Sequence, residues 1–258
     1  MATPPPLDLI LVLDVGNSGA KIGAVRGEQV AGPVRLPRAD GRAVGDLARP
    51  MLQGRKAVIA VTGSDPQKIE GLIWEVRKLR LGTLVSVGPD HKGIPAAQVD
   101  APAKAGVDRR LQVLAATTLA GGAAAAVVSA GTALTVDLGD ANGALLGGAI
   151  APGLSLGATA LSSGTALLPK IDLAGDTTMP GRSTETAIRA GLLLGAAGAV
   201  ERLLEAAGLE ASAPVYLTGQ DAPHLQPHVR RELRPHPGLG LLGAALAVRA
   251  APPLKADA

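Results

Sequence analysis

Residues 9–18 read LILVLDVGNS. The aliphatic run in this stretch predicts a buried strand, and the glycine and asparagine that follow it predict a tight turn. Two shorter stretches of roughly alternating polarity, at 20–26 and 29–36, predict two further antiparallel strands. The chain therefore opens with a buried strand, a glycine turn and a hairpin.

Helix and strand patterns alternate after this hairpin. Helices are predicted at 42–53 and 66–79, and buried strands are predicted at 57–62 and 83–87. Helices that alternate with buried strands indicate an α/β sheet. A stretch rich in Pro and Gly then runs from residue 88 to residue 106, and its length predicts a functional loop.

The opening pattern occurs a second time. A predicted strand at 125–130 ends in a Gly-Thr turn, and strands at 133–138 and 144–150 follow it. The two patterns together predict an α/β protein of two related halves, 1–114 and 115–258, with a cleft between them. The other predicted elements are helices at 108–120, 153–163, 183–207 and 238–250 and a strand at 214–218.

The composition excludes several classes of protein. The chain has 258 residues and no Cys, which excludes disulfides, thiolate catalysis and cysteine-based zinc sites. It has no Phe, one Trp and one Tyr, so it lacks the aromatic platforms on which single-stranded nucleic acid stacks. The net charge of +3 comes from scattered Lys and Arg. We therefore expect no nucleic-acid partner, and anionic small substrates suit this charge.

Other familiar signals are absent or weak. No apolar run reaches the roughly 18 residues of a membrane-spanning helix, and residues 1–8 lack the basic region of a signal peptide. We expect a cytoplasmic protein without a membrane partner. The absence of GxxxxGKS or GxxxxGKT excludes a P-loop kinase. Residues 238–243 match GxGxxG but follow no clear strand, and we interpret them as small residues that pack a terminal helix.

The first chemical motif is the turn at 14–18. The strand delivers Asp14 to its C-terminal end, and Gly16 lets backbone N–H groups approach an anion closely. Asn17 and Ser18 add hydrogen-bond donors. This set suits a nucleotide phosphate with its magnesium, the metal being held by Asp14 directly or through water. The alternative is a plain β-turn before a hairpin.

The second motif reads SAGTALTVD at 129–137 and repeats the succession of strand, glycine, hydroxyl, strand and acid. Gly131 and Thr132 occupy its turn. Two such turns that face each other form a phosphate clamp with donors from both sides. Phosphoryl transfer requires such positioning and charge neutralisation.

The third motif ends the Pro-rich loop and opens a helix with Gly106, Val107, Asp108 and Arg109. A carboxylate at Asp108 can accept a proton from a substrate hydroxyl. The guanidinium of Arg109 can bind a substrate carboxylate through two parallel hydrogen bonds. The alternative is a helix-capping aspartate beside a solvated arginine.

Seven motifs occur in the order seen in one known family. They are DVGNS at 14–18, VSVGP at 85–89, DAPAKAGVDR at 100–109, GTALTVD at 131–137, GGAIAPGL at 147–154, GRSTETAIRAG at 181–191 and LTG at 217–219. As an ordered set they resemble the type III pantothenate kinases. The resemblance implies an actin/hexokinase-type fold of two ribonuclease-H-like halves, each a mixed sheet flanked by helices. It also implies ATP-dependent phosphorylation of pantothenate to 4′-phosphopantothenate, the first step of coenzyme A biosynthesis.

The resemblance further implies a role for each matching residue. Asp14 corresponds to an acid associated with a divalent cation such as Mg²⁺, and Asp108 corresponds to the general base. Arg109 would pair with the pantothenate carboxylate, and the family forms homodimers. The remaining correspondences are Gly16, Asn17 and Ser18 for the first phosphate turn, Gly131 and Thr132 for the second, and Gly106 and Thr184 for contacts to pantothenate.

Three positions depart from the family pattern. Ser129 stands where the family has an acid associated with a monovalent cation, K⁺ or NH₄⁺. Ser18 replaces a threonine, and Gln220 replaces a second glycine. The neutral Ser129 suggests an enzyme with altered ion dependence. Two alternatives stay open: a catalytically weak relative that acts as a regulatory or binding module, and a kinase of the same fold with another hydroxylated acid as substrate.

Overall fold

The computed structural model describes residues 7–16, 19–36 and 38–252. The chain divides into two compact units. Unit 1 comprises Met1–Ala123, Gly139–Leu146 and Gly238–Ala258, and unit 2 comprises Ala124–Leu138 and Gly147–Pro237. This division differs from the predicted boundary between residues 114 and 115, because the chain returns to unit 1 twice.

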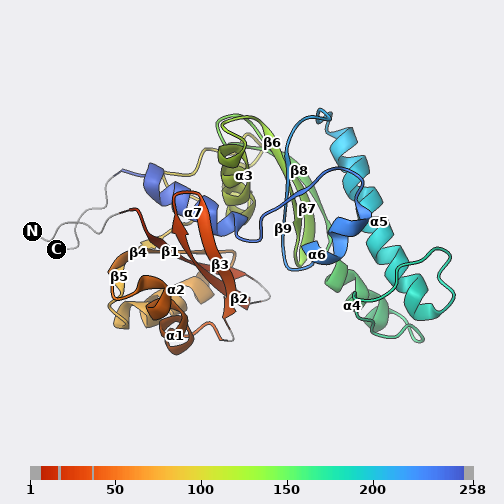
Figure 1. The fold of residues 1–258 in the computed structure, drawn as a ribbon, viewed down its shortest axis with the longest axis horizontal. Helices are drawn as coiled ribbons and strands as arrows, with labels where there is room; N and C mark the ends of the chain where they lie inside the picture. Colours follow the sequence, from red (N-terminus) through yellow and green to blue (C-terminus); the bar gives the residue numbers. More distant parts are fainter. Residues whose placement is uncertain (1–6, 17–18, 37, 253–258) are drawn as a thin grey trace, which may run out of the picture. The chain divides into compact units, whose positions relative to one another are not determined.

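Unit 1 is built on a five-stranded mixed sheet with the order β3-β2-β1-β4-β5 (Figure 1). The central strand β1 pairs antiparallel with β2 and parallel with β4. The strands are β1 (Ile10–Gly16), β2 (Gly19–Arg26), β3 (Gln29–Leu36), β4 (Ala57–Gly63) and β5 (Gly82–Ser86). The helices are α1 (Gly41–Leu52), α2 (Pro66–Lys78), the 3-10 turn η1 (Pro102–Lys104), α3 (Val107–Leu119) and α7 (Leu239–Ala250).

Successive side chains of β1 point to opposite faces of this sheet. Leu11 and Leu13 belong to the core that α1 and α2 cover. Ile10 and Val12 are fully buried on the other face, where α3 and α7 pack on the sheet. Asp14 follows Val12 in this alternation. The fold therefore places the first acid of the motif on the face that α3 covers.

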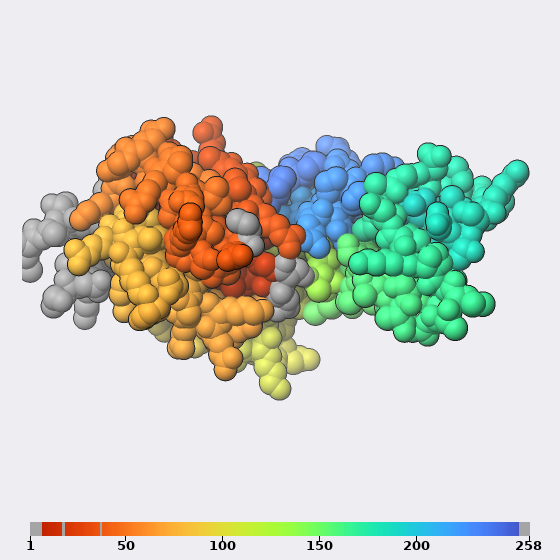
Figure 2. Space-filling model, turned by 90° about the horizontal axis from the view of Figure 1, so that it is seen from below, coloured from red at the N-terminus to blue at the C-terminus, as the bar shows by residue number. Residues whose placement is uncertain are grey.

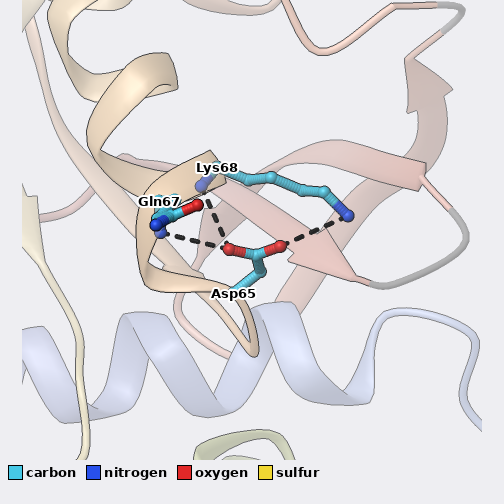
Figure 3. Close-up of polar contacts among 3 residues, drawn as sticks. All are labelled: Asp65, Gln67 and Lys68. Atoms are coloured by element: carbon cyan, nitrogen blue, oxygen red, sulfur yellow. Dashed lines mark hydrogen bonds and ion pairs between the residues drawn. The ribbon is translucent and has the colours of Figure 1, made fainter.

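The start of α2 is fixed by Asp65. Its Oδ1 accepts hydrogen bonds from the backbone N–H groups of Gln67 (3.1 Å) and Lys68 (3.2 Å), and Lys68 Nζ lies 3.4 Å from Oδ2 (Figure 3). These hydrogen bonds, chiefly that from Lys68 N, lower the pKa of Asp65. Just before this cap, Ser64 N donates to Val15 O (3.2 Å) and joins the end of β4 to the end of β1.

Unit 2 is built on a second mixed sheet with the order β10-β9-β6-β7-β8. Its central strands β6 and β9 are parallel. The strands are β6 (Ala125–Ala130), β7 (Ala133–Gly139), β8 (Leu145–Pro152), β9 (Val215–Thr218) and β10 (Arg234–Pro235). The helices are α4 (Leu154–Gly164), α5 (Thr184–Ala206) and α6 (Ala222–Leu225), followed by the 3-10 turn η2 (Gln226–His228). Val128, Val200 and Leu217 lie in the core that joins the sheet to α5.

The predicted arrangement of two mixed sheets, each flanked by helices, is confirmed. The predicted order of the first half is also confirmed, and the element ends differ by a residue or two. Four short elements were not predicted: η1, α6, η2 and β10. Among the described residues, no helix combines the length and apolar character needed to cross a membrane.

Candidate active site

Asp14 lies near the C-terminal end of β1, directly opposite Lys21 on β2. Its Oδ2 is 3.3 Å from Lys21 Nζ, and 17% of the aspartate side chain is exposed. Burial raises the pKa of Asp14, Lys21 opposes this rise, and the charge of Asp108 adds to it. The charge of Asp108 therefore acts on the Asp14 carboxylate within unit 1.

Oxygen ligands of this kind fit a magnesium ion. Mg²⁺ is commonly held by one or two carboxylates, with water and substrate phosphates completing its shell. The described part of the chain contains no cluster of three or more His, Cys, Asp or Glu side chains that could hold a metal. The carboxylate of Asp14 could supply one such oxygen ligand.

Gly16 ends β1 and pairs with Gly19 across the start of the hairpin. Asn17 and Ser18, predicted to donate to phosphate, lie outside the described residues. Two cationic side chains that the sequence analysis did not select flank this turn. Lys21 pairs with Arg35 in the β2–β3 register, and a Cβ added at Gly19 would lie 3.2 Å from Arg35 Nη2. The cross-strand register of the hairpin brings both to the turn, and the linear sequence does not display that register.

The start of α3 positions the third motif. Gly106 is the N-cap and makes no side-chain capping bond, and Asp108 lies in the first helical turn with its side chain exposed. Asp108 is therefore not the N-cap of this helix, contrary to the alternative interpretation. A carboxylate in the first turn interacts favourably with the helix dipole.

Gly106 leaves the space that the Asp108 carboxylate occupies. A Cβ added at Gly106 would lie 2.6 Å from Asp108 Oδ1, closer than real Cβ contacts, and 3.7 Å from Arg109 Cδ. The Arg109 side chain is half-buried and has polar interactions of its own. The structure thus brings Gly106, Asp108 and Arg109 together in one helical turn, with Asp14 in the same unit.

The second glycine turn lies in unit 2, between β6 and β7. Gly131 N donates to Ala133 O (3.0 Å), and Gly153 N donates to Thr132 O (3.1 Å). A Cβ at Gly153 would overlap the carbonyl oxygens of Gly131 and Thr132. Only glycine allows the start of α4 to approach this turn so closely, and the exposed Thr132 lies beside the helix N-terminus.

Ser129 lies one residue before the end of β6 and pairs with Thr218 of β9. Beyond β9, Gly219 has φ +104°, and a Cβ there would overlap Ala130 O. Asp221 then turns back toward the same strand end. Its backbone N donates to Ala130 O (2.9 Å), and its buried Oδ2 accepts from Ser155 N (3.2 Å). The sequence analysis missed this buried acid, although it follows the LTG motif closely.

Thr184 is the first residue of α5, after the N-cap Ser183. Ser183 and Thr186 form a capping box, in which each side chain bonds the backbone of the other residue. Thr184 itself is exposed and lines a hollow with Leu161, Leu168, Ala187, Ile188, Gly191 and Leu192.

The described site residues thus fall into two groups. Unit 1 holds Asp14, Gly16, Gly106, Asp108 and Arg109, and unit 2 holds Ser129, Gly131, Thr132 and Thr184.

Comparisons with known proteins show the family of the chain. A family model described as type III pantothenate kinase matches residues 10–206. Two similar proteins bear the same name. The one from Porphyromonas gingivalis strain W83 is 34% identical over 239 residues, which cover 90% of this chain and 95% of the relative. The one from Frankia casuarinae is 32% identical over 247 residues, which cover 92% of this chain and 98% of the relative.

Solved structures show the fold. A putative Baf family transcriptional activator from Campylobacter jejuni matches with a TM-score of 0.58 at 17% identity, with 93% of this chain and 97% of that chain covered. Component A of the (R)-2-hydroxyglutaryl-CoA dehydratase of Acidaminococcus fermentans also matches with a TM-score of 0.58, at 15% identity and with 94% and 98% covered. These two proteins share the fold of this chain, in which two mixed sheets are each flanked by helices.

Proposed function

The chain belongs to the type III pantothenate kinase family, and on that premise we propose that it transfers the γ-phosphoryl group of ATP to the primary hydroxyl of pantothenate. The product is 4′-phosphopantothenate, and the reaction is the first step of coenzyme A biosynthesis. The observation that carries the proposal is that the charge of Asp108, an exposed acid at the start of α3, reaches the partly buried Asp14 at the glycine turn. Burial raises the pKa of Asp14, and the charge of Asp108 adds to this rise.

In this proposal Asp108 is the general base. Its exposed carboxylate accepts the proton of the pantothenate hydroxyl as the hydroxyl oxygen attacks the γ-phosphorus and ADP leaves. Arg109, the next residue of α3, binds the pantothenate carboxylate through its guanidinium. Gly106 gives Asp108 its space, and Thr184 of α5 adds a further contact to pantothenate.

The two glycine turns bind the phosphates of ATP. The residues to which we assign this role are Gly16, Asn17 and Ser18 in the first motif and Gly131 and Thr132 in the second. The start of α4 beside Thr132 supports this role, because helix N-termini favour anions. Asp14 holds Mg²⁺ directly or through water, and this ion neutralises charge on the phosphates when it is bound.

The exposed apolar surface of unit 2 supports a homodimer. The residues from α4 to the start of α5, green to teal in Figure 2, lie at the surface of the molecule. Leu156, Leu167 and Met179 are exposed there, Leu167 to 91%. Covering such side chains with a second copy of the chain removes apolar area from water. We include the homodimer in the proposal on this ground and on the family resemblance.

A coupled ADP-release assay tests the proposal. Purified protein receives ATP, Mg²⁺ and pantothenate, with Na⁺ in one run and K⁺ or NH₄⁺ in another. ADP release that depends on pantothenate is the expected result. Release with K⁺ or NH₄⁺ alone would indicate that the cation site persists despite Ser129, and equal release in all runs would indicate an enzyme without that requirement.

The regulatory alternative rests on Ser129 alone, and the relatives lend it no support. Folded protein that binds ATP and pantothenate but releases no ADP in any run would contradict the kinase proposal and favour that alternative.

A further inference from the structure

The loop at 88–106 lies between β5 and α3 and leads directly to the proposed pantothenate residues. It contains three prolines, which have no N–H to donate, and a single 3-10 turn, η1. The loop is nonetheless packed closely on unit 1. Ile94 and Ala97 are buried, and a Cβ added at Gly93 would overlap Ala247 O of α7. Contacts other than those of regular secondary structure therefore hold the loop in place.

The guanidinium of Arg110 lies at the centre of this packing. Its Nη1 donates to Pro89 O (2.7 Å), and its Nη2 donates to Pro95 O (3.0 Å). The two carbonyls lie on separate parts of the loop, so one planar side chain joins both to α3. Hydrogen bonds from a charged donor are shorter and stronger than neutral ones.

Arg110 reaches the loop from the inner side of α3. It is 6% exposed, whereas Asp108, two positions earlier, is exposed to solvent. Residues two positions apart on a helix point in nearly opposite directions. The first turn of α3 therefore presents its acid outward and its arginine inward, beneath the loop. Arg110 does not share the exposed side of the helix on which Asp108 lies.

Burying this cation is costly. Its Nε has no hydrogen-bond partner among the described residues, and burial lowers the pKa of Arg110, partly offset by Asp90. A buried charge whose donors are only partly satisfied costs free energy that a smaller apolar residue would avoid. The buried arginine links two loop carbonyls to the helix.

We propose that Arg110 is a positioning residue of the acceptor site, which clamps the 88–106 loop to the first turn of α3 and so fixes the loop relative to Asp108 and Arg109. The inference rests on the proposed function and deepens it. A loosened loop would leave Gly106, and with it the first turn of α3 that carries Asp108 and Arg109, less firmly placed, while the glycine turn at the end of β1 would keep its hold on ATP. Displacements of about 1 Å can cost on the order of 100-fold in rate.

The test compares Arg110→Lys with Arg249→Lys. Arg249 also joins two carbonyls in unit 1, with Nε donating to Leu7 O (3.2 Å) and Nη1 donating to Gly27 O (2.7 Å). Lysine keeps the charge and loses the planar pair of donors in both variants. We expect R110K to raise the KM for pantothenate about tenfold and to leave the KM for ATP within about twofold. R249K should change neither constant.

Two results would overturn the proposal: an unchanged KM for pantothenate in folded R110K, or a parallel rise of both KM values. If R110K does not fold, Arg110→Gln replaces it, because Gln removes the buried charge and keeps one amide donor group. We expect this variant also to raise the KM for pantothenate and to leave the KM for ATP unchanged. Hydrogen exchange of the amides of residues 91–98 gives a readout without turnover. Faster exchange in R110K than in R249K supports the clamp, and equal exchange overturns it. A wild-type protein without pantothenate-dependent ADP release would defeat the proposed function separately.

Discussion

The Asp108 carboxylate is exposed in the first turn of α3, and its charge adds to the rise in the pKa of Asp14 that burial causes. Asn has nearly the same shape and cannot accept the proton. We therefore expect Asp108→Asn to keep ATP binding and to lower kcat about 10²- to 10⁴-fold. Turnover by the ADP-release assay and ATP binding by calorimetry measure the two effects. Asp46→Asn, at an exposed position on α1, is the matched control, and near-normal turnover of D108N would remove Asp108 from the mechanism.

Gly106 has no Cβ, and the Asp108 carboxylate lies where that atom would contact it. A Cβ there would lie 2.6 Å from Asp108 Oδ1, so the carboxylate must move in Gly106→Ala. We expect kcat to fall about tenfold with the melting temperature unchanged, because the base and not the core is displaced. Gly71→Ala on α2 is the control, since a Cβ at Gly71 meets nothing within 4 Å. Wild-type kcat in G106A would show that the position of this carboxylate is not critical.

The buried carboxylate of Asp14 is needed for the proposed reaction, but in its ionised form it lowers the stability of the fold. Burial raises its pKa above the ordinary value, so the folded state binds the proton more tightly than the unfolded state does. This group therefore costs stability progressively as pH rises through its folded pKa. Asp14→Asn should melt higher than wild type at neutral pH, show a shrinking difference in acid, and lose turnover. Thermal unfolding across pH checks this prediction, and a lower melting temperature of D14N at neutral pH would contradict it.

At the scale of elements, the start of α2 depends on the cap provided by Asp65 (Figure 3). The capping bonds lower its pKa in the folded state, so its contribution is present at neutral pH and is lost as pH falls through that value. Asp65→Ala should lower the melting temperature by a few degrees at neutral pH and by less in acid. Asp65→Asn, which can still cap, should retain most of the stability. Equal losses in D65A and D65N would assign the effect to the ion pair with Lys68.

The sequence predicted most elements because aliphatic runs and helical periodicity are local signals. It missed η1, α6, η2 and β10, which are too short for any periodicity, and it could not identify Asp221 as a buried partner of Ser155 N. Lys21 and Arg35 were missed for a related reason. Their proximity to the first turn arises from the register between strands, which the linear pattern does not display.

At the scale of the whole molecule, the last helix joins the first unit. A Cβ added at Gly243 would overlap Leu111 O of α3, so only glycine allows α7 to pack this closely. The sequence analysis expected small residues that pack a terminal helix, but no local pattern shows on which unit the helix packs. The predicted boundary at 114 and 115 therefore missed the return of the chain to unit 1.

Gly243→Ala tests this connection between the end of the chain and its beginning. We expect a loss of about 1–3 kcal/mol in the free energy of unfolding, because the added methyl group overpacks a helix contact. Gly240→Ala on the same helix is the control, since its Cβ would lie 3.8 Å from Gln112 Cγ, an ordinary contact. Denaturant unfolding measures both variants. Equal stabilities of G243A and G240A would show that the close α7–α3 contact is not required.

The central claim is the identity of the reaction, and analysis of the product tests it most directly. The protein is incubated with ATP, Mg²⁺ and pantothenate, and the products are examined by mass spectrometry and phosphorus NMR. We predict ADP together with pantothenate that carries one phosphoryl group as an ester of its primary hydroxyl, formed by wild type and not by D108N. ADP without phosphorylated pantothenate, or unchanged ATP from folded protein, would contradict the assignment.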